Sequence, residues 1–311
     1  MIFFNSNKNG LSLFDIRTAY IVAAALVLAA LSYILITGLS MFIKKERYRG
    51  LRLTTKNIAY IAMLSTVSIV TTVVIALYMP AAVLPPIRIA IEGLMIKITG
   101  YIFGPVIGIL CALITDILVM MFVPSYIHPA YIVAVIGFGF ISGIAGDLRR
   151  MFHQNSWILI LITNIFIIGF GTTALVMTYY APQFADFSVD EVPFTKNVPI
   201  KKWIMMLIIS IGTVLILVVV WATWMYFHFV KKDVKGFNDL VPIILLAVIN
   251  EYIITVLIAS WGDVSLLTNR TEDYGLAMIP RLAMAPIKIF FNTVIIYITW
   301  KTIRPLINED R

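Results

Sequence analysis

The chain of 311 residues has few charged side chains and a single cysteine. Asp, Glu, Lys and Arg make up only 13% of it, about half the share that is usual in soluble domains. So small a charged fraction excludes a soluble globular protein. The lone Cys111 excludes a disulfide framework and a thiolate metal site. The chain also lacks a soluble basic domain with interleaved aromatic residues, so we expect no nucleic-acid partner.

Enzymatic motifs are missing as well. The sequence has no His-Glu-x-x-His, no Gly-x-Ser-x-Gly and no Walker motif. We therefore expect no catalytic residues, no metal site and no cofactor, and we expect that the chain is not an enzyme. Because it has no site for ATP hydrolysis, any active transport would draw its energy from ions or from a partner.

Long apolar runs are abundant instead. Hydrophobic residues are 61% of the chain and its mean hydropathy is +0.96. A transmembrane helix needs about 20 apolar residues, and nine stretches approach or exceed that length. They are residues 19–43, 56–79, 88–104, 105–123, 128–147, 157–180, 203–230, 240–261 and 276–300. The pattern predicts an all-α, polytopic membrane helical bundle.

Basic residues predict the orientation of the bundle, because loops rich in Lys and Arg are cytoplasmic. With nine spans, four basic clusters fall on one side. They are Lys44, Lys45, Arg47, Arg49, Arg52 and Lys56; Arg149 and Arg150; Lys231, Lys232 and Lys235; and Lys301 and Arg304. We expect a multi-pass protein of the cell (plasma) membrane with a cytoplasmic C-terminus. The net charge of +8 follows mostly from this bias.

Several charges fall inside the apolar runs, where Arg, Lys or Asp costs about 2.5–3.5 kcal/mol on insertion scales. They are Arg88, Glu92, Lys97, Asp116, Glu251 and Lys288. Such charges suggest a functional site, and all of them lie within 56–150 and 240–300. A structural alternative is pairing across helices, Lys97 with Asp116 and Lys288 with Glu251, which would satisfy most of them.

A second group of residues gathers at the predicted outer ends of the helices. It comprises Arg88, Tyr126, His128, Trp261, Asp263, Arg270 and Arg281. Arginine is normally sparse on that side, and its guanidinium matches a carboxylate or phosphate with two hydrogen bonds. We interpret Arg88 and Arg281 as part of an outward-open pocket for an anionic small molecule. The alternative, favoured for Arg270, is that these arginines reach headgroups or cap helices.

Glycines at four-residue spacing mark the third to fifth spans. Gly100, Gly104 and Gly108 form one series, and Gly139 with Gly143 repeats the spacing. Small residues at this interval let helix backbones approach closely in lipid. The spacing predicts that these three spans form a tight cluster.

Several motifs together resemble one family. The first are Ile87-Arg-Ile-Ala-Ile-Glu-Gly-Leu, Gly100-Tyr-Ile-Phe-Gly-Pro-Val-Ile-Gly, Asp116-Ile-Leu and the turn at Pro124. The later ones are residues 245–261 and Ile279-Pro-Arg-Leu-Ala, with Pro286 and Lys288. In this order they resemble the S components of energy-coupling factor (ECF) vitamin transporters, and the folate-type member is the most similar. The resemblance covers about half of the chain.

The resemblance implies a fold and a function. S components have six membrane helices, bind a vitamin at the outer end and deliver it by reorienting in the membrane on a T subunit. For this chain it implies high-affinity binding of folate or a related anionic vitamin. The implied partners are a transmembrane T subunit, two cytoplasmic ATPase subunits and membrane lipids. The implied ligand-binding residues, together with those proposed from the outer group, are Arg88, Glu92, Tyr126, His128, Trp261 and Arg281.

The expected organisation is a six-span, S-component-like core with about three additional transmembrane helices. Residues 1–55 would form an extra N-terminal helix and a basic cytoplasmic linker, and 56–150 the first part of the core. Residues 151–238 would form an inserted peripheral helical pair, and 239–311 the last two core helices and the cytoplasmic C-terminus. One departure is Glu92, where the family has an aromatic or apolar residue. Another is the second span, where Met63 follows Ala59 in place of a small residue.

Two other functions stay open at this point. One is an ion-coupled secondary carrier that uses the intramembrane residues Asp116, Glu251 and Lys288. The other is a membrane-embedded lipid-modifying enzyme, for which Arg149 and His153 are the inner-face candidates. Uptake by the chain alone, collapsed by an ionophore, would favour the carrier. The enzyme would need a catalytic dyad that faces the headgroups.

Overall fold

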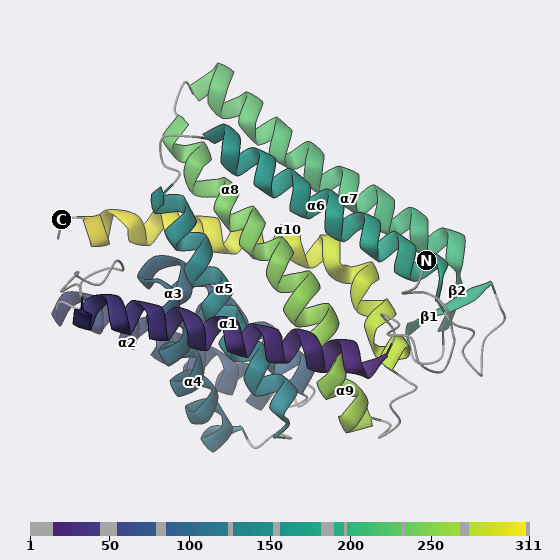
Figure 1. Ribbon diagram of the computed structural model, residues 1–311, viewed down its shortest axis with the longest axis horizontal. Helices are drawn as coiled ribbons and strands as arrows, with labels where there is room; N and C mark the ends of the chain where they lie inside the picture. The colour runs from purple at the N-terminus through teal and green to yellow at the C-terminus, as the bar shows by residue number, and fades with distance from the viewer. Residues whose placement is uncertain are drawn as a thin grey trace. The chain divides into compact units, whose positions relative to one another are not determined.

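The computed structural model describes residues 15–43, 55–78, 85–123, 127–151, 156–181, 190–195, 198–231, 234–267 and 274–308. Nearly all of these residues are helical (Figure 1). The elements of the first half are α1 (Ile16–Ile43), α2 (Thr55–Tyr78), α3 (Pro85–Phe103), α4 (Pro105–Phe122), α5 (Pro129–Met151) and α6 (Ser156–Tyr179). The later ones are β1 (Glu191–Thr195), β2 (Val198–Lys201), α7 (Lys202–Met225), η2 (Tyr226–Lys231), α8 (Val234–Ile249), η3 (Asn250–Ile258), α9 (Ala259–Leu267) and α10 (Tyr274–Asn308).

Seven helical segments among the described residues are long and apolar enough to cross a membrane. They are Ile16–Leu39, Pro105–Phe122, Pro129–Met151, Trp157–Tyr179, Lys202–Phe229, Gly236–Leu266 and Ala277–Pro305. Two shorter apolar helical stretches, Ile58–Val74 and Gly93–Phe103, lie where the second and third spans were expected. The chain is therefore an all-α, multi-pass membrane protein, as the sequence predicted.

The break between α3 and α4 follows from two residues. Pro105 has no backbone N–H, so it is favoured at the first position of a new helix, and α4 begins there. Gly104 before it has a φ of 98°, a left-handed conformation that glycine adopts without steric cost. The chain thus turns from one helix into the next with a single residue between them.

The chain divides into two compact units. The first unit comprises Met1–Val22 and Phe152–Thr293, and the second comprises Ala23–Met151 and Val294–Arg311. The helix α10 thus contributes its first part to one unit and its last part to the other. The sequence-based division into four parts stays a prediction.

In the second unit, α3, α4 and α5 pack against one another through glycines, and α2 contacts α3 and α4. A Cβ atom placed on Gly108 would lie 2.5 Å from the carbonyl oxygen of Gly139, and one placed on Gly100 would lie 2.5 Å from the same oxygen. Both distances are far below van der Waals contact, so only glycine allows this approach. The tight cluster predicted from the glycine spacing is confirmed.

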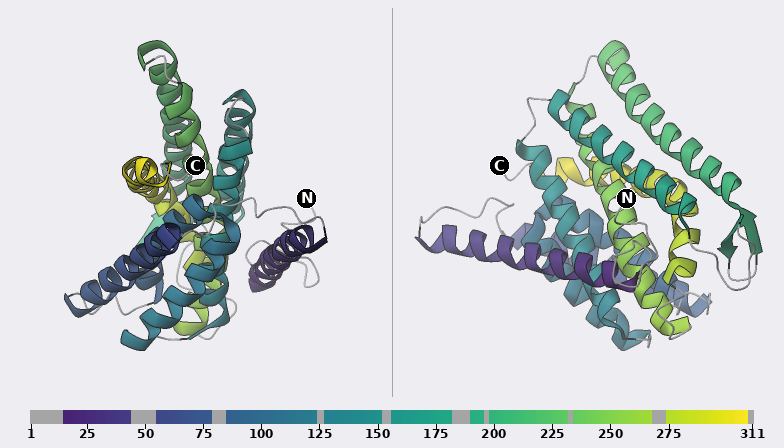
Figure 2. Two further views of the ribbon diagram at one scale, coloured as in Figure 1. Left: turned by 90° about the vertical axis from the view of Figure 1, so that its left-hand side faces the viewer. Right: turned by 45° about the vertical axis from the view of Figure 1, so that its right-hand side comes forward.

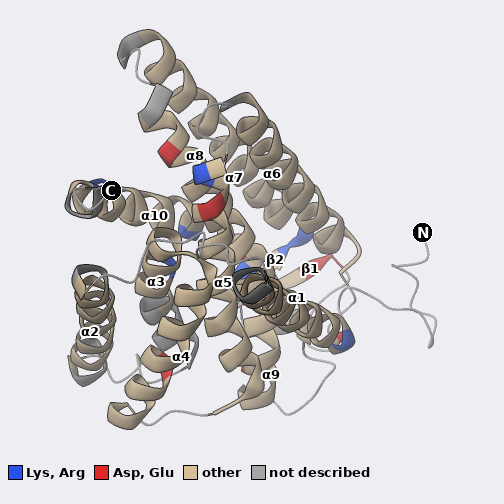
Figure 3. Ribbon diagram, turned by 60° about the vertical axis from the view of Figure 1, so that its left-hand side comes forward, with Lys and Arg blue, Asp and Glu red and all other residues tan. Residues whose placement is uncertain are grey.

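In the first unit, α8 and η3 follow one another, and most of the residues from 236 to 258 are buried. The helix α6 packs on both α7 and α8, and the ring of Phe170 in α6 stacks on Tyr252 in η3 with centroids 5.2 Å apart. Figure 3 shows α6 and α7 almost without charged residues; α6 has none, and α7 has only Lys202. Their many exposed large apolar side chains suit a lipid-facing position.

A two-stranded hairpin is the one departure from helix among the ordered elements described above. Strands β1 and β2 pair antiparallel, with Val192 opposite Ile200, and β2 leads directly into α7 (Figure 2). The sequence predicted only a helical pair over residues 151–238, so this hairpin was not expected.

Candidate functional site

The candidate site of the first unit is built around a change of helical register. In η3 the backbone has π-helical geometry, and the N–H of Ala259 donates to the carbonyl of Ile254, five residues back. From Ala259 onward α9 is an α-helix, in which each N–H donates four residues back. The next acceptor is therefore Val256, and the carbonyl of Thr255 is passed over. A buried carbonyl without a donor is costly, so it needs a partner from elsewhere.

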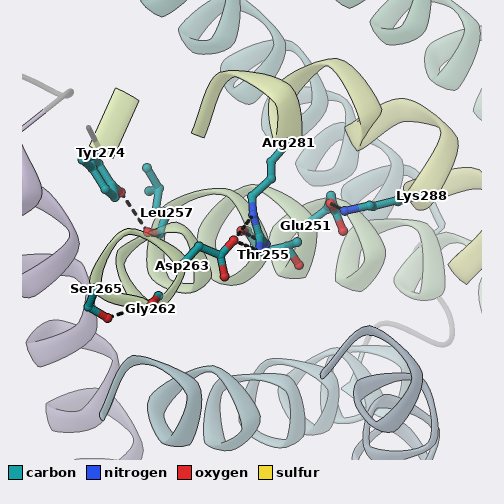
Figure 4. A network of polar contacts seen from close by, with 9 residues as sticks. All are labelled: Glu251, Thr255, Leu257, Gly262, Asp263, Ser265, Tyr274, Arg281 and Lys288. Carbon is teal, nitrogen blue, oxygen red and sulfur yellow. Dashed lines mark hydrogen bonds and ion pairs between the residues drawn. The ribbon is translucent and has the colours of Figure 1, made fainter. Parts of the chain in front are cut away.

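Arg281 in α10 supplies that partner (Figure 4). Its Nη1 donates to the carbonyl oxygen of Thr255 at 2.7 Å. Its Nε donates to Oδ2 of Asp263 in α9 at 3.1 Å, and its Nη2 donates to the same oxygen. The two side chains are largely buried, with exposed fractions of 12% for Arg281 and 9% for Asp263. Both charges are thus compensated locally, which offsets part of the cost of burying them.

Tyr274 supports the same region from the start of α10. Its hydroxyl donates to the carbonyl oxygen of Leu257 at 2.8 Å. Burial raises the pKa of the Tyr274 phenol above its ordinary value, although the nearby Arg281 lowers it. The phenol therefore stays protonated and remains a hydrogen-bond donor at physiological pH. Two side chains of α10 thus donate to backbone carbonyls of η3.

A second ion pair lies further along the same two elements. The Nζ of Lys288 is 3.5 Å from Oε1 of Glu251, which is only 2% exposed. Lys288 lies seven residues after Arg281, so both basic side chains project from the same face of α10. The predicted pairing of Lys288 with Glu251 is confirmed. The pairing of Lys97 with Asp116 stays a prediction; the Nζ of Lys97 lies 4.4 Å from the ring centre of Phe138.

Trp261 and His128, two of the predicted site residues, have local partners. Trp261 lies in α9, two residues before Asp263, and its half-buried ring meets that of Tyr20 edge-on with centroids 4.8 Å apart. His128 immediately precedes α5, and its Nδ1 accepts a hydrogen bond from the N–H of Ala130 at 3.2 Å. This is the geometry of an N-terminal helix cap. Burial lowers the pKa of His128, which favours the neutral ring that such an acceptor requires.

The structure describes little of the other predicted site residues. The backbones of Arg88 and Glu92 belong to α3, but their side chains lie outside the described part of the chain. Tyr126, Arg270 and His153 also lie outside it. Their roles stay predictions. Trp261 and Arg281 belong to the first unit, whereas His128 belongs to the second.

The second unit has a polar network that the sequence analysis did not predict. Nη2 of Arg150 donates to the carbonyl oxygen of Ile102 at 2.7 Å, and its Nη1 pairs with Asp147 at 3.1 Å. The hydroxyl of Tyr33 donates to the same carboxylate at 2.8 Å. Ile102 lies two residues before the α3–α4 break. Pro105 has no N–H to donate to a carbonyl of the preceding turn. The Gly104-Pro105 pair was therefore the sequence feature that indicated a need for side-chain donors near this break.

Arg149, a candidate of the enzyme hypothesis, stacks on aromatic rings in the same unit. Its Cζ lies 4.0 Å from the ring centre of Trp300 and 5.4 Å from that of Tyr101. Within the described ranges, no three His, Cys, Asp or Glu side chains gather closely enough to hold a metal ion. The arrangement of Arg149 is typical of cation–π packing.

Comparisons with known proteins give one distant relative. No family model matches the chain, and no solved structure matches it. A protein of Mycoplasma pneumoniae (strain ATCC 29342 / M129), described as "Uncharacterized protein MG098 homolog", is 23% identical to it. The similarity covers 94% of this chain and 71% of that protein. It therefore extends along nearly the whole chain, beyond the stretches that resemble S components.

Proposed function

We propose that the chain is the vitamin-binding S component of an ECF-type importer of the cell membrane, most similar to the folate-type member. It binds an anionic vitamin at its outer end. It then reorients on a transmembrane T subunit powered by two cytoplasmic ATPases. Its C-terminus is cytoplasmic, and six of its helices form the S-component-like core.

The observation that carries the proposal is the guanidinium of Arg281. It is held in place between Thr255 and Asp263, and these contacts use three of its five N–H bonds. Two N–H bonds thus have no acceptor among the described residues. A guanidinium that is held rigidly and not saturated is suited to an acidic ligand, because little side-chain entropy is lost on binding.

The helix α9 that holds Asp263 also has an aromatic side chain. Trp261 stands two residues before Asp263 and is only half-buried. A folate molecule combines a flat pterin ring with a glutamate tail that has two carboxylates. An indole and a guanidinium are complementary to these two parts.

The test of the proposal has two stages. First, the chain is purified alone and its affinity for folate is measured by calorimetry, with co-purifying ligands identified by mass spectrometry. Second, uptake of radiolabelled folate is measured in proteoliposomes with and without the T subunit and the ATPases. We expect tight binding by the chain alone, and uptake only with the partners and ATP. Absence of folate binding would refute the vitamin assignment.

The ion-coupled carrier remains a second candidate, and the ion pair of Glu251 with Lys288 favours it. Glu251 is buried at 3.5 Å from Lys288 within the apolar segment Gly236–Leu266. Buried ionisable residues in membrane segments commonly mark ion pathways. Uptake by the chain alone that an ionophore collapses, and that Glu251→Gln abolishes, would select this function over the first.

A further inference from the structure

We propose that the Nε–Nη2 edge of Arg281 is a carboxylate site that Asp263 occupies in the ligand-free chain, and that a carboxylate of the transported molecule replaces Asp263 there. The inference rests on the proposed function, because it concerns how that site recognises an acid. It makes Asp263 a specificity-determining residue that competes with the ligand.

The first support is the orientation of the guanidinium. The carbonyl of Thr255 accepts from Nη1 at 2.7 Å, and this carbonyl is available only because the π-helix returns to α geometry at Ala259. The contact directs the opposite edge, made of Nε and Nη2, toward Asp263 (Figure 4). Because the backbone holds Nη1, this edge keeps its direction whichever carboxylate lies in front of it.

The second support is the way in which Asp263 accepts hydrogen bonds from the Nε–Nη2 edge of Arg281. Both Nε and Nη2 donate to the same atom, Oδ2. The strongest pairing of a guanidinium with a carboxylate instead uses two parallel hydrogen bonds, one to each oxygen. A free carboxylate can adopt that geometry, whereas Asp263 is confined by its position on α9. The ligand therefore gains a second oxygen contact in the exchange.

The third support is the position of Asp263 in the chain. It belongs to α9, a nine-residue helix that follows the change of register at Ala259. The N–H of Ala259 anchors the start of α9 to η3, and Asp263 lies four residues further along. It also lies at the predicted outer end, where a displaced carboxylate reaches water. In the exchange, the side chain of Asp263 turns from Arg281 toward that end as the ligand takes its place.

The exchange predicts a selectivity. A simple acid has little advantage over Asp263, because it replaces one carboxylate by another. A larger ligand that makes further contacts with the protein gains over Asp263 through those contacts. The site would therefore discriminate against small carboxylates in favour of larger molecules with an acidic tail.

The test compares Asp263→Asn with wild type in lipid nanodiscs, using folate and glutarate as probes. The Asn side chain keeps an oxygen acceptor for Arg281 but removes the competing charge. We expect Asp263→Asn to bind folate at least tenfold more tightly and to bind glutarate measurably. Both gains should vanish in the double variant Asp263→Asn with Arg281→Lys, since lysine keeps the charge but lacks the two-nitrogen edge.

The matched control is Asp239→Asn, which removes another buried carboxylate of the same unit. It should leave both affinities unchanged, and the thermal unfolding of each variant shows whether it is folded. Folate binding that is equal or weaker in Asp263→Asn would overturn the exchange while the proposed function stands.

The remaining outcomes separate the carboxylate exchange at Arg281 from the vitamin assignment of the proposed function. Absence of folate binding by wild type, together with Arg281-dependent binding of glutarate by Asp263→Asn, would support the exchange and refute the vitamin. Absence of binding of either probe to both wild type and Asp263→Asn would overturn both.

Discussion

The side chain of Arg281 donates to the carbonyl of Thr255 at 2.7 Å, at the end of η3, where the return from π to α geometry passes over an acceptor. The same arrangement occurs in the second unit, where Arg150 donates to the carbonyl of Ile102 near the α3–α4 break. Each arginine is also paired with an aspartate, Asp263 in one case and Asp147 in the other. In both units an Arg–Asp pair thus satisfies a backbone carbonyl where a helix is irregular.

Arg281→Ala should destabilise the protein strongly. The change leaves Asp263 buried without its cation and Thr255 without its donor, and breaking one side of a buried ion pair costs about 3–5 kcal/mol. Thermal unfolding in detergent measures the effect. Lys301→Ala, an exposed cation of the same helix, is the control and should change little. Equal melting temperatures for the two variants would show that the contacts of Arg281 with Asp263 and Thr255 do not stabilise the fold.

Lys288→Met should be more harmful alone than together with Glu251→Gln. The single change leaves the Glu251 carboxylate, which is 2% exposed, without its countercharge. The double change removes both charges at once, and neutral replacement of a buried pair is often tolerated. A double-mutant cycle on unfolding free energies should give a coupling of about 0.5–3 kcal/mol. Strict additivity would mean that the two side chains do not act as a pair.

Gly139→Ala should disrupt the packing of α3, α4 and α5. An added Cβ meets the backbone carbonyl of Gly108, and backbone cannot move aside as a flexible side chain can. Overpacking of this kind costs about 1–3 kcal/mol or more. The matched control is Gly169→Ala in α6, where nothing lies within 4 Å of the added atom. Yield and melting temperature of the two variants should differ clearly, and similar values would show that the close approach is dispensable.

The cap at His128 should make stability depend on pH. Burial lowers the pKa of His128 in the folded chain, so the unfolded chain binds the proton more readily. The stabilisation is therefore present above the unfolded pKa of about 6.5 and is lost as the pH falls through the folded value. Protonation also removes the acceptor that Ala130 uses, and a helix cap is worth about 0.5–2 kcal/mol.

Asn is a good cap that does not titrate, so His128→Asn is the comparison. Unfolding of both proteins is measured between pH 5 and pH 8 at constant salt. The difference between their free energies of unfolding should change with pH. The wild type should become less stable relative to the variant toward pH 5. A constant difference would show that His128 does not titrate in this range.

Part of the candidate site was predictable from local charge. Glu251 and Lys288 stand in long apolar runs, and the cost of an isolated charge in lipid required that they find partners. Asp263 was recognised as a neighbour of the arginines, but not as the partner of Arg281. The π-helical turn could not be foreseen, because the sequence of η3 has no proline or glycine to mark it.

The sequence by itself determined the helical type of the chain and the approximate bounds of several of its helices. Apolar length and the positions of Pro and Gly act over a few neighbouring residues, so the expected spans 56–79, 105–123 and 157–180 agree closely with α2, α4 and α6. Only the tertiary structure decided which carbonyl Arg281 reaches and which carboxylate faces it. Those contacts join segments that are 18 and 26 residues apart, and they depend on how the helices pack and on a register change that local preference does not encode.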